Sequence, residues 1–169
     1  MSGPAPLVRV EELKKLFPIQ HGFAQAVLRK PTEYVHAVDG IDFVIQRGEV
    51  LGLSGMSGCG KTTTGKMLAS LEVPTSGRIW FKDREVTRLR GEELKGFRRR
   101  VQMVFQDPYQ SLDPRYTILR TLAEPLVIHG LGASREDRKG IVSDSLRHVG
   151  LTPPEEFLSR YPHELSGGQ

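Results

Sequence analysis

Residues 50–63 read VLGLSGMSGCGKTT, and this stretch indicates the class of fold. The short apolar run at residues 50–53 is typical of a parallel strand that is buried on both faces. A turn rich in glycine follows, and residues 61–71 then show the apolar spacing of a helix. The order of strand, glycine-rich turn and helix predicts a mixed α/β fold.

The turn itself has the spacing of a phosphate-binding loop, with Gly55, four residues, and then Gly60, Lys61 and Thr62. Glycines let the amide hydrogens point inward, and the amino end of the helix adds partial positive charge. Lys61 would reach the β and γ phosphates of a nucleoside triphosphate, and the Thr62 hydroxyl would be a ligand of Mg2+. The candidate binding residues of this phosphate loop are Gly55, Ser57, Gly58, Cys59, Gly60, Lys61, Thr62 and Thr63. A chance glycine-rich turn is the alternative, and Cys59 is more simply a small loop residue than a catalytic thiol.

Outside the loop the apolar period changes along the chain. Residues 34–46 alternate with Ile41, Phe43 and Ile45 on one face, as in a half-buried strand, whereas the residues beyond Pro114 show a helical period. Strands are expected at residues 7–10, 34–46, 78–82 and 101–105, and a basic helix at residues 92–100. Two further helices are expected, one with Leu119, Leu122, Leu126 and Val127 on its apolar face and one with Ile141, Leu146 and Val149. Ser134 can cap the second of these helices and Gly150 can end it.

The composition is that of an ordinary globular chain of 169 residues with a net charge of +4 and a single cysteine. One cysteine excludes an internal disulfide and a cysteine cluster for zinc, which fits a reducing cytosolic setting. No run approaches about 18 apolar residues, so a tie to a membrane would need a partner. Residues 82–100 hold eight basic and four acidic side chains. We interpret them as a solvated helix face, and no nucleic-acid partner is expected.

Two further segments carry a resemblance to a known family. Residues 104–108, VFQDP, resemble the glutamine loop of ATP-binding-cassette (ABC) ATPases, and residues 165–169, LSGGQ, resemble the signature of that family. The longer stretches QDPYQSLDPR (residues 106–115) and RYPHELSGGQ (residues 160–169) are most similar to the oligopeptide and dipeptide importer branch. The resemblance runs over nearly the whole chain.

The fold implied by this resemblance is a P-loop NTPase (RecA-like) core with an amino-terminal antiparallel β subdomain and an inserted helical subdomain, in truncated form. Residues 1–116 would form the β subdomain and part of the core, and residues 117–169 the helical subdomain up to the signature.

The resemblance also assigns roles to single residues. Gln106 would contact Mg2+ and the attacking water, so Lys61 and Gln106 are the expected catalytic residues. An aromatic ring would stack on adenine, for which Phe17 is the first candidate and Tyr34 the second. In the family each signature contacts the nucleotide held by a second cassette, which would involve Ser166, Gly167, Gly168 and Gln169.

The implied function is an ATP-binding and ATP-hydrolysing subunit that energises an importer of oligopeptides or dipeptides. Its partners would be an identical or homologous ABC ATPase subunit, the transmembrane permease subunits that the Asp113–Arg115 surface would face, and indirectly a solute-binding protein. Such a subunit lies at the cytoplasmic face of the cell membrane. The solute stays open between peptides, nickel and other small solutes.

The sequence ends at Gln169, before the segment that supplies the Walker B acid and the switch histidine in the family. We therefore expect an amino-terminal fragment that binds Mg-ATP with negligible turnover. His163 precedes the signature and is expected to serve in local packing or capping. A kinase or GTPase that uses Asp107 as its Walker B acid is disfavoured, because guanine specificity needs an Asn-Lys-x-Asp segment that the sequence lacks. A non-transport ABC ATPase acting on DNA or the ribosome, and a nucleotide-binding remnant without hydrolysis, stay open as alternatives.

Overall fold

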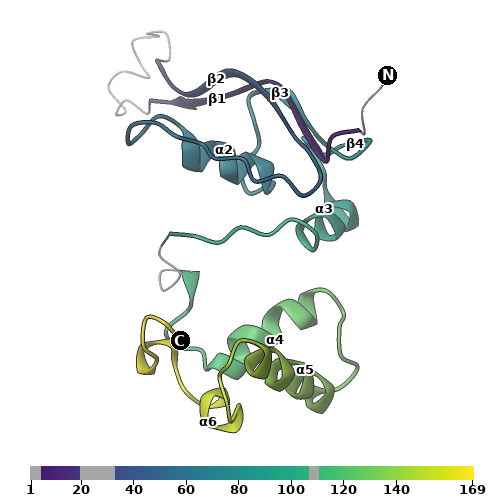
Figure 1. Cartoon of the computed structure of the whole chain (residues 1–169), viewed down its shortest axis with the longest axis vertical. Helices are drawn as coiled ribbons and strands as arrows, with labels where there is room; N and C mark the ends of the chain where they lie inside the picture. Colours follow the sequence, from purple (N-terminus) through teal and green to yellow (C-terminus); the bar gives the residue numbers. More distant parts are fainter. Residues whose placement is uncertain (1–4, 20–32, 107–110) are drawn as a thin grey trace, which may run out of the picture. The chain divides into compact units, whose positions relative to one another are not determined.

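The computed structural model describes residues 5–19, 33–106 and 111–169, and it divides the chain into two compact units (Figure 1). The first unit is Met1–Met103 and the second is Val104–Gln169, and each has its own hydrophobic core. Asp107 and Pro108 of the expected glutamine loop lie outside the described residues. Within the described ranges no helix has the length and apolarity needed to cross a membrane.

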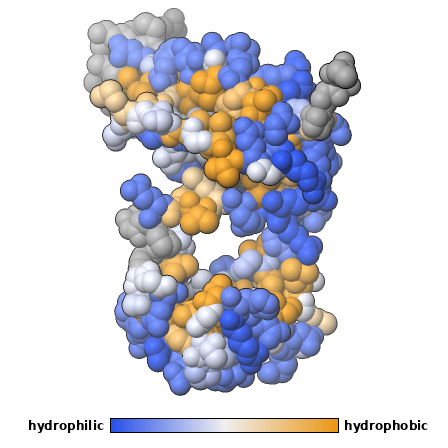
Figure 2. Space-filling model, viewed as in Figure 1, coloured by the Kyte–Doolittle hydropathy of each residue, from blue (hydrophilic) through white to orange (hydrophobic). Residues whose placement is uncertain are grey.

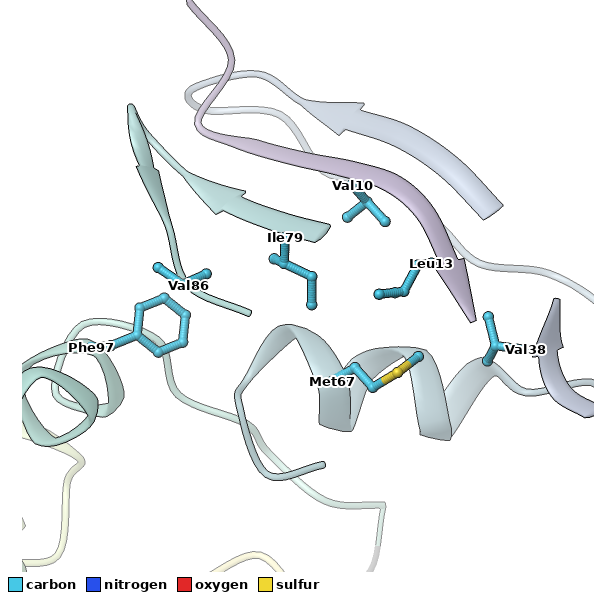
Figure 3. Packing of buried hydrophobic residues seen from close by; sticks show 7 residues of the cluster. All are labelled: Val10, Leu13, Val38, Met67, Ile79, Val86 and Phe97. Carbon is cyan, nitrogen blue, oxygen red and sulfur yellow. The ribbon is translucent and has the colours of Figure 1, made fainter. Parts of the chain in front are cut away.

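The first unit is a four-stranded antiparallel sheet, with strand order β2-β1-β3-β4, that packs against a helix. Its elements are β1 (Val8–Pro18), β2 (Tyr34–Ile45), α2 (Lys61–Leu68), β3 (Ser76–Phe81), β4 (Arg84–Glu85) and α3 (Gly91–Arg98). Figure 3 shows Met67 of α2 directed toward the sheet residues Leu13 and Val38, in a cluster that also contains Val10, Ile79, Val86 and Phe97. Because Leu13 and Met67 are almost fully buried, this contact fixes α2 on one face of the sheet.

A β-bulge in β1 decides which side chains face α2. Val10 pairs with Phe43, and the next pair joins Leu13 to Ile41. Between these two pairs β1 advances by three residues and β2 by only two. Glu12 in the bulge has a φ of 46°, and its amide donates to Asp42 Oδ1 at 2.8 Å. A side chain at Gly77 would place a Cβ 2.3 Å from the Glu12 carbonyl oxygen, so only glycine fits beside the bulge. The bulge brings Leu13 onto the same face as Val10.

The second unit is helical and consists of α4 (Ile118–Ile128), α5 (Arg135–His148), α6 (Glu155–Leu158) and the 3-10 turn η2 (Pro162–Glu164). Its core contains Ile118, Val142, Leu146, Phe157 and Leu158. The predicted cap of α5 is confirmed, because Ser134 Oγ accepts from the Asp137 amide at 3.0 Å and Asp137 Oδ2 accepts from the Ser134 amide at 2.9 Å. Gly150, with a φ of 81°, follows the end of α5 as expected.

The predictions of a buried parallel strand at residues 50–53 and of a further buried strand at residues 101–105 are wrong for this structure. Neither segment forms a strand, and Val50 is 95% exposed and Val104 90% exposed. Figure 2 shows further apolar side chains on the surface of both units. A central parallel strand needs neighbouring strands to satisfy its backbone and helices to cover its faces. Among the described residues, the strands of the sheet pair only with one another in antiparallel order.

Candidate nucleotide site

The phosphate loop precedes α2 and depends on glycine at three positions. Gly55, Gly58 and Gly60 have φ values of 150°, 82° and 93°, a region that side chains disfavour. A Cβ at Gly55 would lie 2.7 Å from Cys59 Sγ, and a Cβ at Gly60 would lie 2.1 Å from the Ala37 carbonyl oxygen. The loop is therefore seated directly on the backbone of β2.

Ala37 reaches the loop because it is a bulge residue of β2. The register pairs Leu16 with His36 and Lys15 with Val38, so Ala37 has no partner on β1. A residue skipped in the ladder is free to turn its carbonyl elsewhere. Here that carbonyl lies against Gly60, the N-cap residue of α2, so the sheet contacts the start of the helix.

Lys61 is the first residue of α2, and its side chain folds back over the loop. Its Nζ donates to the Gly55 carbonyl at 2.8 Å and to the Met56 carbonyl at 2.7 Å, and it lies 3.5 Å from Cys59 Sγ. The first turn of α2 carries no acidic side chain, so no carboxylate of that turn offsets its partial positive charge. The ammonium group and the helix end thus both favour an anion at this loop.

The three threonines that follow Lys61 have different environments. Thr64 is buried, and its hydroxyl donates to the Gly60 carbonyl at 3.0 Å, so that hydroxyl is engaged within the first turn. Thr63 is half-buried, whereas Thr62 is exposed. Mg2+ prefers oxygen ligands and keeps several waters, which an exposed hydroxyl allows. Thr62 therefore fits the expected role of metal ligand better than its two neighbours.

The two candidate aromatic rings lie at one end of the hairpin formed by β1 and β2. Phe17 pairs with Val35 and is 38% exposed, and Tyr34 pairs with Pro18 and is 50% exposed. Successive residues of a strand point to opposite faces, so Phe17 shares the face of Leu13, against which α2 packs. Tyr34 occupies the next register position and points to the opposite face.

Lys15 is a residue of this site that the sequence does not single out. Its Nζ lies 4.9 Å from the centre of the Phe17 ring and 2.6 Å from Glu72 Oε1. The only local signal is a pair of adjacent lysines, Lys14 and Lys15, of which either could face α2. The bulge in β1 decides which of the two lysines faces α2. No rule of composition or spacing predicts that bulge from the sequence.

Gln106 and the Asp113–Arg115 turn belong to the second unit, near its start. Gln106 is exposed. Asp113 accepts hydrogen bonds from the Arg115 backbone amide at 3.0 Å and from the guanidinium nitrogens Nε at 3.0 Å and Nη2 at 2.9 Å. These bonds from Arg115 lower the pKa of Asp113 to about 2. The turn is thus closed by its own side chains.

The signature residues lie at the surface of the same unit. Ser166, Gly167, Gly168 and Gln169 are all exposed, and a Cβ at either glycine would meet no atom within 4 Å. The Ser166 amide donates to Gln169 Oε1 at 3.0 Å, and the Gln169 amide donates to the Ser166 carbonyl at 2.9 Å. The turn thus leaves the hydroxyl of Ser166 at an open surface. His163, which precedes it, stacks on Tyr161 with 5.6 Å between ring centres.

The structure therefore gathers the predicted residues into two groups. Phe17 and the phosphate loop, residues 55–63, belong to the first unit, and Gln106 and residues 166–169 belong to the second. The first group offers a ring, an ammonium group, a helix end and a hydroxyl, which match the base, the phosphates and the metal of a magnesium nucleotide.

Comparisons with known proteins show which family this chain resembles. Residues 38–169 match the family described as ABC transporter. The chain is 44% identical over 164 residues to the oligopeptide transport ATP-binding protein AppF of Bacillus subtilis (strain 168), covering 96% of this chain and 48% of AppF. It is 43% identical to the glutathione import ATP-binding protein GsiA of Escherichia coli (strain K12), covering 97% of this chain and 25% of GsiA.

Among solved structures, the dimeric ATP-binding cassette MJ0796 bound to ADP and Pi superimposes with a TM-score of 0.71 and 28% sequence identity. That match covers 96% of this chain and 64% of MJ0796. The chain spans about half the length of AppF. The predicted combination of an antiparallel sheet with a helical unit is confirmed by this likeness.

Proposed function

This chain belongs to the ABC transporter family, and from that premise we propose that it is the nucleotide-binding part of an ATPase subunit that energises import of oligopeptides or dipeptides. The observation that carries the proposal is the Lys61 ammonium held over a glycine loop at the start of α2. The names of AppF and GsiA, which refer to oligopeptide transport and glutathione import, support the choice of peptides.

The roles within the first unit follow from the chemistry of each group. The amides of residues 55–60 and the Lys61 ammonium bind the β and γ phosphates, and the Thr62 hydroxyl holds Mg2+. Phe17 stacks on adenine, because it shares the face of the sheet against which α2 packs, whereas Tyr34 points the other way. Bound Mg2+ supplies charge stabilisation to the transferring phosphoryl group.

The second unit adds two contacts in the assembled importer. By the family resemblance, Gln106 would contact Mg2+ and the attacking water, and Ser166 with the two glycines after it would contact the nucleotide of a second cassette. The dimeric state of MJ0796 supports such a pair of cassettes. For the 169 residues the proposal is nucleotide binding, and ATP hydrolysis coupled to import is proposed for the whole protein.

A groove of about 680 Å³ between α4 and α5 supports the proposed contact with a permease. Its apolar lining includes Leu119, Ala123 and Val127, and its charged lining residues are Arg120, Glu124, Arg135, Glu136, Arg138 and Lys139. An amphipathic segment of a membrane subunit fits a groove lined by both apolar and charged side chains. Through this contact the subunit is held at the cytoplasmic face of the membrane, and the solute-binding protein acts on it only indirectly.

The test compares ATP binding by the chain and by its Lys61→Ala variant in isothermal titration calorimetry with Mg2+ present. Loss of a charged group that donates to phosphates is expected to weaken binding at least about tenfold. Lys66→Ala is the matched control, since Lys66 is an exposed lysine of the same helix and lies outside the loop. Equal affinities of the two variants would contradict the proposal.

A further inference from the structure

Lys15 is unusually well held for a lysine on a small sheet. Its side chain is 13% exposed, whereas that of the adjacent Lys14 is 41% exposed. The Lys15 ammonium lies 2.6 Å from Glu72 Oε1 and donates to the Val73 carbonyl at 2.7 Å. Two charge-assisted hydrogen bonds in a mostly enclosed position fix the end of this flexible side chain in one place.

The fixed ammonium group lies against the ring of Phe17, with 4.9 Å between Nζ and the ring centre. Lys15 and Phe17 are two residues apart on β1, so both side chains leave the strand on the same face. A cation at this distance from a ring is attracted by the negative π face. Since Phe17 remains 38% exposed, the ring is held by the cation and is still accessible to a ligand.

The same contacts relate the ring to the phosphate loop. Glu72 and Val73 follow α2, the helix that begins with Lys61. On the other side, Phe17 pairs with Val35, which is two residues, or about 7 Å, from the bulge residue Ala37 that touches Gly60. The ring and the phosphate loop therefore lie at the same end of the sheet, and Lys15 ties β1 to the segment after α2.

We infer that Lys15 is a positioning residue that holds the Phe17 ring in the orientation that stacks on the adenine base. The inference rests on the proposed nucleotide function. Lys15 acts on the base only through the ring and makes no contact with the phosphates. Its charge draws π density toward one face of the ring, so the opposite face stacks better on an electron-rich purine. A ring that is already oriented also loses less conformational entropy when the base binds, which favours binding.

The test separates binding of the base from binding of the phosphates. Calorimetry is carried out with ATP and with inorganic tripolyphosphate on the full chain and on Lys15→Met, which keeps an unbranched apolar side chain and removes the ammonium group. The Kd for ATP is expected to rise about fivefold, and the Kd for tripolyphosphate is expected to stay unchanged. Lys15→Arg, which retains a cation, should restore most of the ATP affinity.

Lys14→Met is the matched control, because Lys14 pairs with Asp39 at 3.2 Å on the more exposed side of the strand. It should leave both affinities unchanged. Equal weakening of ATP and tripolyphosphate in Lys15→Met, or no change in either, overturns the inference. If instead the unsubstituted chain binds ATP no better than Lys61→Ala, the proposed function itself fails.

A second measurement addresses the contact without any nucleotide. A ring beside an aliphatic amine shifts the resonances of the nearby methylene protons, so the Lys15 ε-methylene signals are expected upfield of those of Lys14. Phe17→Leu should return them to the position found for Lys14. Unchanged Lys15 signals in Phe17→Leu would mean that the ring does not lie against the ammonium group, and the inference would then be abandoned.

Discussion

Gly60 lies directly against the backbone of β2, and Gly58 in the same loop does not, so the two glycines can be compared. Both have positive φ, but a Cβ at Gly58 meets no atom within 4 Å, whereas a Cβ at Gly60 meets Ala37 and Val38. We expect Gly58→Ala to lower the free energy of unfolding by about 1 kcal/mol through strain alone. Gly60→Ala should lower it by about 3 kcal/mol, because strain and overlap add.

Urea unfolding followed by the fluorescence of Trp80, the only tryptophan, measures this difference, since Trp80 lies on β3 of the same unit. ATP affinity should fall further in Gly60→Ala than in Gly58→Ala. Equal losses of stability in the two variants would show that the overlap of a Cβ at position 60 with the Ala37 carbonyl oxygen does not lower the free energy of unfolding.

At the scale of single residues, the phosphate loop can be predicted from a short window of sequence, whereas the orientation of Lys15 cannot. The loop is a local pattern whose spacing predicts phosphate binding. In the structure Lys61 Nζ donates to the Gly55 and Met56 carbonyls, and its contact with phosphates stays a prediction. The facing of Lys15 depends on an extra residue in the ladder near Glu12. Strict alternation from Val10 would have turned Lys14 toward α2 instead.

The capping box formed by Ser134 and Asp137 makes the stability of α5 depend on pH. The backbone amide and side chain of Ser134 hold the pKa of Asp137 below its usual 3.8. A carboxyl whose pKa is lower in the folded state stabilises the fold above its unfolded pKa, and the effect is lost as the pH falls through the folded value. The helical unit should therefore melt at a lower temperature at pH 3 than at pH 7.

Asp137→Asn is expected to reduce this pH dependence, and far-UV circular dichroism of the full chain measures it. Asp144→Asn on the same helix is the control, because Asp144 pairs with Arg147 on the exposed side and does not cap the helix. The difference in melting temperature between pH 3 and pH 7 should be larger in Asp144→Asn than in Asp137→Asn. A pH dependence as large in Asp137→Asn as in the unsubstituted chain would contradict the assignment.

At the scale of elements, the caps were predictable and the buried strands were not. Ser134 and Gly150 act on residues within one turn of themselves, so a short window of sequence contains their whole effect. The apolar runs at residues 50–53 and 101–105 carry the right residue types for central strands. A strand, however, forms only where other strands meet its backbone, and that condition is not local.

The division of the whole molecule into two units predicts two independent unfolding events. Leu146, in the core of the second unit, is 3% exposed, and Leu13, in the core of the first, is 0% exposed. Leu146→Ala should destabilise the helical unit by about 2–5 kcal/mol and shift the circular dichroism transition, leaving the Trp80 fluorescence transition in place. Leu13→Ala should shift the Trp80 fluorescence transition and leave the circular dichroism transition of the helical unit in place. A joint shift of both signals in either variant would mean that the units unfold as one.

For the whole molecule, the resemblance in the loop, glutamine and signature segments was enough to identify the family, which the match over residues 38–169 confirms. The arrangement of the core was harder to predict. The antiparallel sheet and the helical unit each bury their own apolar faces and are present as expected. Residues 50–53 have no such partner among the described residues, and Val50 is accordingly exposed.

The contact between Gly60 and Ala37 also has a genetic consequence. The atom that excludes a side chain at position 60 is a carbonyl oxygen of the main chain, which every amino acid possesses. No replacement of Ala37 can remove it, and a smaller residue at Val38 would relieve only the contact with its Cγ2. A selection for intragenic suppressors of Gly60→Ala should therefore return true revertants to glycine and few second-site changes.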